Sequence, residues 1–266
     1  MNIRRFSGYK NTPLLWKDSV REDIPEMLEL EKSDNVPSID DPRVKLRLGK
    51  LVERFFFSEL ECVNSIDVVA LNIQIIKDKI TIGELDCIIK NNNYYQHIEV
   101  VYKFYLYDEI DSTNELVNWV GPNKKDSLIE KLDKLADKQF PLLYKQEAAY
   151  LFKVMVLPSP SRIKQLTFFK AQLFIPFAQE VNFNLLNKEC VEGVYVNLDQ
   201  LFSFSNNQFY IPKKLDWLCK PHEEVNYVDF ETFRVELVKW LDKQKSPLCW
   251  MKTVQGELTK LFVVWW

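Results

Sequence analysis

Histidine and glycine are both scarce in this chain of 266 residues, which holds 2 His and 6 Gly. With only His97 and His222 present, a metal or acid–base site built from several histidines is poorly supplied. The few glycines form no Walker loop, no dinucleotide-binding fingerprint and no GxSxG elbow. The common nucleotide-binding and serine-hydrolase motifs are therefore missing.

Cysteine pairs are missing as well. The five cysteines are odd in number, far apart and never spaced as CxxC, which excludes a recognisable zinc ribbon and argues against a disulfide framework. Free thiols in a reducing compartment are expected. Residues 1–10 carry charges without an apolar core, and no apolar run approaches the ~20 residues of a membrane span. We therefore expect a cytoplasmic protein with no membrane partner.

Excess positive charge is absent too, because the formal net charge is −3. Any surface that binds nucleic acid must then be a local patch rather than a property of the whole molecule. The hydrophobic share of 47% and the charged share of 27% are those of an ordinary globular protein. The length allows one large domain or two modest ones.

The hydrophobic pattern between residues 41 and 139 predicts a helix, a three-strand meander and a second helix. Asp41 is a suitable N-cap and Pro42 suits the first turn of the first helix, whose apolar face runs to Phe56. Runs rich in Val and Ile, separated by polar turns, predict strands over 66–76, 80–90 and 94–107. The second helix is predicted over 124–139.

The flanking regions are less informative. Residues 1–40 are expected to form an N-terminal arm or short helices packed on the outside. Beyond Pro141 the pattern predicts strands over 153–157, 166–177, 194–197, 208–211 and 258–265, with a helix over 229–243. The fold class is thus α/β (α+β), with a core over 41–157 and a β-rich C-terminal region over 158–266. This region is either part of the same domain or a second one.

Two carboxylates interrupt what should be a buried strand. Glu84 and Asp86 share one face of the strand over 80–90, and Glu99 lies on one face of the next strand. If the turn between these strands holds an even number of residues, Asp86 lies opposite Glu99; an odd number places Leu85 there instead. Opposed carboxylates ~5 Å apart at Cβ repel each other. A divalent cation such as Mg²⁺ between them converts that repulsion into coordination.

These residues resemble a known nuclease core. The segment Gly83-Glu84-Leu85-Asp86, followed by His97-Ile98-Glu99-Val100-Val101, is similar to the core motif of PD-(D/E)XK nucleases. The stretch over 43–140 is also similar to an uncharacterised bacterial domain family that is placed, by pattern, in the same superfamily. The resemblance implies that Asp86 and Glu99 bind Mg²⁺ or Mn²⁺, that Glu53 contributes from the preceding helix, and that the substrate is nucleic acid, with DNA favoured.

The lysine departs from that pattern. The superfamily places it two residues after the glutamate, where this chain has Val101, and Lys103 lies one step further along the same face, ~6.5 Å away. We expect Lys103 to position water or to stabilise charge on phosphate. Gln139 resembles a helical glutamine that some superfamily members place near the metal. A basic rim for phosphate is predicted from Lys124, Lys125, Lys131 and Lys134.

Three functional hypotheses follow. The first is Mg²⁺-dependent phosphodiester hydrolysis of DNA, with Asp86, Glu99, Lys103 and Glu53 as catalytic residues. The second is a catalytically inactive descendant that binds nucleic acid or protein. The third is a structural module in which acids and lysine neutralise each other. Each candidate residue also has an interpretation without function. Glu84 and Asp86 would be solvated acids on an edge strand, and Glu99 would form an ion pair with Lys103. Glu53 would be an ordinary exposed acid, and the lysines of the second helix would form a solvated face.

Overall fold

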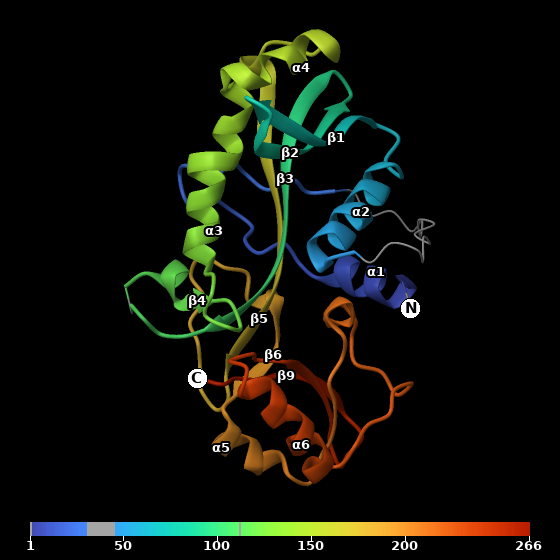
Figure 1. The fold of residues 1–266 in the computed structure, drawn as a ribbon, viewed down its shortest axis with the longest axis vertical. Helices are drawn as coiled ribbons and strands as arrows, with labels where there is room; N and C mark the ends of the chain where they lie inside the picture. The colour runs from blue at the N-terminus through green and yellow to red at the C-terminus, as the bar shows by residue number, and fades with distance from the viewer. Residues whose placement is uncertain (1, 31–45, 112) are drawn as a thin grey trace. The chain divides into compact units, whose positions relative to one another are not determined.

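The computed structural model describes residues 2–30, 46–111 and 113–266 (Figure 1). Within these residues nine strands form one mixed sheet: β1 (Ile66–Lys77), β2 (Ile80–Asn91), β3 (Tyr94–Tyr107), β4 (Trp119–Val120), β5 (Ile163–Pro176), β6 (Val191–Val196), β7 (Gln208–Tyr210), β8 (Leu248–Lys252) and β9 (Leu258–Val263). Their order is β1-β2-β3-β5-β6-β9-β8-β7, with β4 against β3. The expected mixed α/β class is confirmed.

The chain divides into two compact units that are not continuous in sequence. One unit comprises residues 14–102 and 130–170, and it contains the helix–meander region. The other comprises 1–13, 103–129 and 171–266. Strands β3 and β5 contribute residues to both units. Because each unit is assembled from separate stretches, boundaries drawn at residues 40 and 157 do not separate them.

The meander of the first unit forms as the sequence pattern predicts. The bounds of β1, β2 and β3 agree with the predicted strands to within one residue. Helix α2 (Leu48–Leu60) precedes them and buries an apolar face that includes Leu51, Phe55 and Phe56. Figure 1 shows α2 and α3 (Leu128–Lys134) flanking β3. The predicted N-cap Asp41 and first-turn Pro42 lie outside the described residues.

Two predictions after the meander are wrong. The helix predicted from Lys124 begins at Leu128, because Lys124 has a φ of 51° in a tight turn that a helix cannot include. It continues as a π-helical turn over Leu135–Gln139 and a 3₁₀ turn over Phe140–Tyr144. The strand predicted over 153–157 is instead the end of helix α4 (Ala149–Val154) and the turn after it. A short apolar run does not separate helix from strand.

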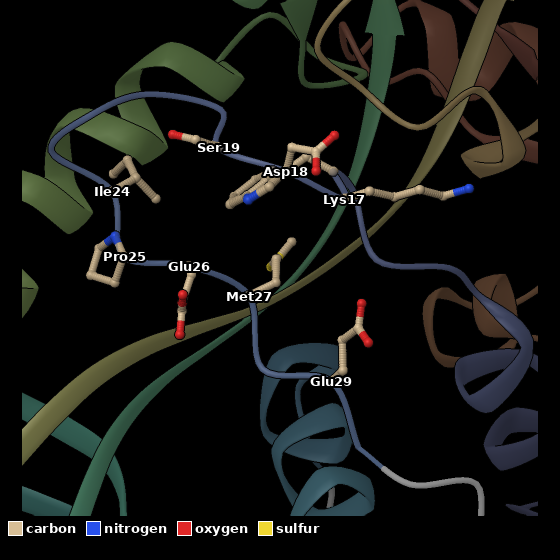
Figure 2. Close-up of a pocket in the computed structure, with 9 residues that line it drawn as sticks. Lys17, Asp18, Ser19, Ile24, Pro25, Glu26, Met27 and Glu29 are labelled. Carbon is tan, nitrogen blue, oxygen red and sulfur yellow. The ribbon is translucent and has the colours of Figure 1, made fainter.

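The N-terminal region is not confined to the outside. Helix α1 (Asn2–Asn11) meets the expectation of a short helix, but Tyr9, Leu15 and Trp16 are buried. Within the first unit, the backbone of Leu15 bonds to Phe169 of β5. The chain then doubles back around a cavity of about 590 Å³ lined by residues between 16 and 29 (Figure 2). Asp18, Glu26 and Glu29 give this cavity an acidic lining, which does not suit a phosphate group.

The second unit contains the C-terminal elements. Strands β6 and β9 run parallel to each other and β8 runs antiparallel to β9. The predicted helix over 229–243 is α6 (Phe230–Leu241), and Asp229 caps it by accepting a hydrogen bond from the Thr232 backbone at 2.8 Å. Strand β8 was not predicted. In the part of the chain that the structure describes, no helix has the length and apolar character needed to cross a membrane.

Candidate functional site

Asp86 and Glu99 lie opposite each other on neighbouring strands. The β2–β3 turn consists of Asn92 and Asn93, an even number of residues, and the paired residues run from Asn91↔Tyr94 to Cys87↔Ile98. One further step along this register places Asp86 across from Glu99. Hydrogen bonding between the two residues also links them. The even-turn alternative is therefore the one that the structure adopts.

Glu99 is buried and Asp86 is half-buried. Glu99 is 0% exposed. Burial is the main cause that raises the pKa of Asp86, and the negative charge of Glu99 raises it further. Burial likewise raises the pKa of Glu99. The Val100 backbone N–H donates to Asp86 Oδ2 at 2.9 Å and stabilises its charged form. Neither carboxylate forms an ion pair with Lys or Arg among residues 2–30, 46–111 and 113–266.

A buried histidine orients Glu99. The side-chain amide nitrogen of Gln165 lies 2.8 Å from the Phe140 carbonyl, which only accepts, so this nitrogen also donates to His97 Nδ1 at 3.1 Å. Burial lowers the pKa of His97 to about 4, so the ring is neutral and its single proton lies on Nε2. Nε2 then donates to Glu99 Oε1 at 3.0 Å. His97 therefore positions Glu99.

A glutamine connects Glu99 to a lysine. Lys131 Nζ donates to Gln139 Oε1 at 2.6 Å, so the amide nitrogen of Gln139 faces and donates to Glu99 Oε2. The positive charge of Lys131 lowers the pKa of both Glu99 and Asp86, against the effect of burial. Lys131, predicted only as part of a phosphate-binding rim, is thus a cation of the acidic site itself.

Replacing Gln139 tests this connection without any assay of activity. Gln139→Met keeps the side-chain length but removes the donor to a buried carboxylate. We expect a loss of about 1–3 kcal/mol in the free energy of unfolding, because a buried acceptor loses its hydrogen bond. The loss should be larger at pH 8 than at pH 5, where more of Glu99 is protonated. Denaturant unfolding measures both values.

The matched control is Gln146→Met, which alters an exposed glutamine in the same unit. Its effect should stay within about 0.5 kcal/mol. Equal effects of the two substitutions would show that the Gln139 hydrogen bond contributes nothing specific.

Glu53 also approaches the acidic pair. It lies on α2 with a side chain 14% exposed, and the charge of Asp86 raises its pKa after the larger effect of burial. Lys50, one turn earlier, donates to Glu53 and to Glu84 at 2.7 Å each. A Cβ added at Gly49 would meet no atom within 4 Å, so this glycine leaves open space beside the site. Glu53 and Glu84 therefore share one ammonium group.

Asn72 was not predicted as part of this site. It lies on β1 between Leu71 and Ile73, which pair with Cys87 and Leu85, so the register places it opposite Asp86. Its φ is 51°, a left-handed conformation that Asn tolerates better than most residues. Its side-chain oxygen accepts from Lys50 Nζ at 2.9 Å. A left-handed residue inside a strand was not detectable from the sequence pattern.

The remaining predicted residues lie elsewhere. Lys103 belongs to the other unit, where its ammonium pairs with Asp126 at 2.6 Å. Lys124 pairs with Asp108 at 2.6 Å and lies 3.8 Å from the centre of the Trp266 ring. Lys125 and Lys134 are exposed. The structure thus brings Asp86, Glu99 and Glu53 together, joined by Lys131, while Lys103 and Lys124 bind acids of their own.

The donor atoms suit a hard divalent cation. Among the described residues, no group of three or more His, Cys, Asp and Glu side chains is arranged to hold a metal ion. Two carboxylates are nevertheless enough for Mg²⁺, which usually keeps several waters and takes one or two protein carboxylates. Glu99 accepts from His97 and Gln139, yet a carboxylate has about four lone-pair sites. Asp86 and Glu99 therefore retain capacity for a shared cation.

The fold and this site define a mixed α/β protein with an opposed pair of acids, one buried and one half-buried, on adjacent strands. The chain belongs to the family described as "Domain of unknown function (DUF1853)", which it matches over residues 8–264. No curated protein matches the chain, and no solved structure matches it.

Proposed function

We propose that this protein is a metal-dependent nuclease that hydrolyses phosphodiester bonds of DNA, on a PD-(D/E)XK-like core. The observation that carries the proposal is the opposition of Asp86 and Glu99 on neighbouring strands, with no lysine or arginine of the described residues ion-paired to either. When both acids are ionised they repel each other, and a cation that joins them removes this cost. The helix–meander–helix order around them supports the same assignment.

The residues divide into those that would hold the ion and those that position them. Asp86 and Glu99 would hold Mg²⁺ or Mn²⁺, with Glu53 assisting from α2. A bound ion of this kind would lower the pKa of a coordinated water and stabilise charge on a phosphate oxygen. His97 and Gln139 hold the two oxygens of Glu99 in fixed directions. Lys131 supplies the positive charge that Lys103 was expected to supply.

A second candidate function has its own support. The Lys103–Asp126 ion pair removes the lysine that most resembles the superfamily's catalytic one. A descendant of the fold that binds nucleic acid or protein without cutting is consistent with that pairing. It predicts retardation of DNA in a gel, weakened by salt, without cleavage.

The decisive experiment incubates the full chain with supercoiled plasmid and with single-stranded circular DNA. Parallel reactions contain Mg²⁺, Mn²⁺, or EDTA without added metal. We expect cleavage of at least one substrate with Mg²⁺ or Mn²⁺ and none with EDTA. Binding without cleavage under every condition would replace the nuclease by the second candidate, and absence of both would remove both.

A further inference from the structure

A pocket with an exposed aromatic ring lies at the β2–β3 hairpin, within the same unit as the acidic pair. Its volume is about 370 Å³. Tyr94, Tyr95 and Gln96 line it from the start of β3, and Arg162 and Lys164 line it from the beginning of β5. Asn91 and Asn92 of the hairpin complete the lining. None of these residues belongs to the acidic site.

Tyr94 presents its ring to solvent. The residue is 75% exposed, the largest exposed fraction of any tyrosine in the described chain. No aromatic ring within the described ranges stacks on it. Exposure of an aromatic ring costs solvation free energy that a stacking ligand would recover. A flat, unpartnered ring of this kind is a suitable platform for a nucleobase.

The charge of the pocket is positive. Arg162 is exposed and has no carboxylate partner in the part of the chain that the structure describes. Lys164 pairs with Glu26, but both side chains of this pair are more than half exposed, so the interaction is weak and solvent-screened. No carboxylate lines the pocket. A negatively charged group such as phosphate is therefore complementary to the charge of this pocket.

Hydrogen-bonding groups lie beside the ring. Asn91, Asn92 and Gln96 all carry carboxamides, which both donate and accept. The Gln96 Oε1 atom is buried without a hydrogen-bond partner in the described structure. The pocket thus offers one group for each part of a nucleotide. The tyrosine ring can stack on the face of the base, the basic side chains can bind the phosphate, and the carboxamides can hydrogen-bond to the edge of the base.

The pocket is joined to the acidic site by one strand. Glu99 lies five positions after Tyr94 on β3, about 16 Å away at a rise of about 3.3 Å per residue, and this odd separation places the two side chains on opposite faces of the strand. Both ends of this stretch belong to the same unit. The pocket is therefore a binding site of its own, and its occupation does not place nucleic acid on the face of β3 that carries Glu99.

We propose that this pocket binds an unpaired base and its neighbouring phosphate, and so selects single-stranded over double-stranded nucleic acid. This inference rests on the proposed function, because it assigns the substrate class of that same protein. In a duplex, bases are already stacked and paired, so Tyr94 could engage one only by extruding it. In a single strand the base is available at little cost.

Binding of fluorescent oligonucleotides to the full chain tests this assignment. The probes are (dT)₂₀, (rU)₂₀ and a 20-base-pair DNA duplex, measured by anisotropy in EDTA so that cleavage plays no part. We expect the wild type to prefer single strands over duplex. Tyr94→Ala should weaken single-strand binding by about 5- to 100-fold, and Tyr94→Phe should restore most of it because the ring remains. Arg162→Gln should reduce the salt dependence of binding.

Matched controls separate the pocket from the general surface. Tyr144→Ala removes another exposed tyrosine of the same unit, and Arg234→Gln removes a partly exposed arginine of the other unit, where it pairs with Glu231. Both should bind like the wild type. Equal losses for Tyr94→Ala and Tyr144→Ala, a preference for duplex, or no binding at all would overturn the inference.

The outcome is distinguishable from failure of the proposed function. Single-strand binding that depends on Tyr94, without cleavage in Mg²⁺ or Mn²⁺, supports the pocket and rejects the nuclease. Cleavage that is unchanged by Tyr94→Ala supports the nuclease and rejects the pocket.

Discussion

Asp86→Asn is expected to reduce metal-dependent cleavage of DNA by at least about 1,000-fold and to leave the protein folded. Asn keeps the size of the side chain and one acceptor for the Val100 backbone N–H, but it removes the charge that would bind the cation. Loss of a single group that stabilises developing charge typically costs about 100- to 1,000-fold, and loss of the ion itself costs more. Plasmid cleavage measures the rate, and calorimetric titration of Mn²⁺ measures ion binding.

Asp67→Asn is the matched control, because Asp67 is an exposed acid on β1 of the same unit. It should cleave DNA and bind Mn²⁺ like the wild type. Circular dichroism of both variants establishes that each is folded. If Asp86→Asn still binds Mn²⁺ with wild-type heat, the opposed acids are not a metal site and the nuclease assignment falls.

The contribution of Asp86 to the stability of the metal-free protein should fall as the pH rises from 4 to 8. Burial raises the pKa of Asp86 to about 7, well above the usual value near 4, so the folded state retains a proton that the unfolded state releases. The stability contributed by the protonated form is present below pH 4 and is lost as the pH rises through about 7. The full loss is about 4 kcal/mol for one carboxyl group.

His97 acts in the opposite direction at lower pH. Its pKa is lowered to about 4, so the unfolded state binds the extra proton between pH 4 and about 6.5. The charge of Asp86 raises the pKa of His97, so this contribution cancels only in part in the difference between wild type and Asp86→Asn. We expect Asp86→Asn to be more stable than the wild type at pH 8 by up to about 4 kcal/mol, with the gain vanishing near pH 4.

Denaturant unfolding at pH 4, 6 and 8, with and without Mn²⁺, gives these values. Mn²⁺ at 100 times its dissociation constant should stabilise the wild type by about 2.7 kcal/mol at pH 8 and leave Asp86→Asn unchanged. A constant difference between the two proteins across this pH range would contradict a buried, ionisable Asp86.

Local features of the fold were predictable from sequence. The strands β1 to β3 alternate in polarity and are separated by short polar turns, so their bounds followed from the pattern to within one residue. The register did not follow from it, because the pattern left open whether the β2–β3 turn holds an even or an odd number of residues, and only the two-residue turn of the structure places Asp86 opposite Glu99. The N-cap Asp229 was likewise predictable, because a side-chain cap acts within four residues.

Features that depend on distant residues were not predictable. Lys103 was expected to point along the face of Glu99, but Asp126, 23 residues away, binds its ammonium. Strand β8 and helix α4 are short, and only their neighbours decide between helix and strand. The contact from Gln165 to His97 joins residues 68 positions apart, which no local pattern encodes.

The hydrogen bond from Gln165 to His97 affects how readily Glu99 can bind a ligand. Because the amide of Gln165 is also fixed on the Phe140 carbonyl, the His97 ring cannot exchange tautomers without breaking a buried hydrogen bond. Glu99 is therefore immobilised when the chain folds, and the entropy of ordering it is lost at that stage rather than on association. A cation arriving at this carboxylate would meet a preorganised group, with little reorganisation left to oppose its capture.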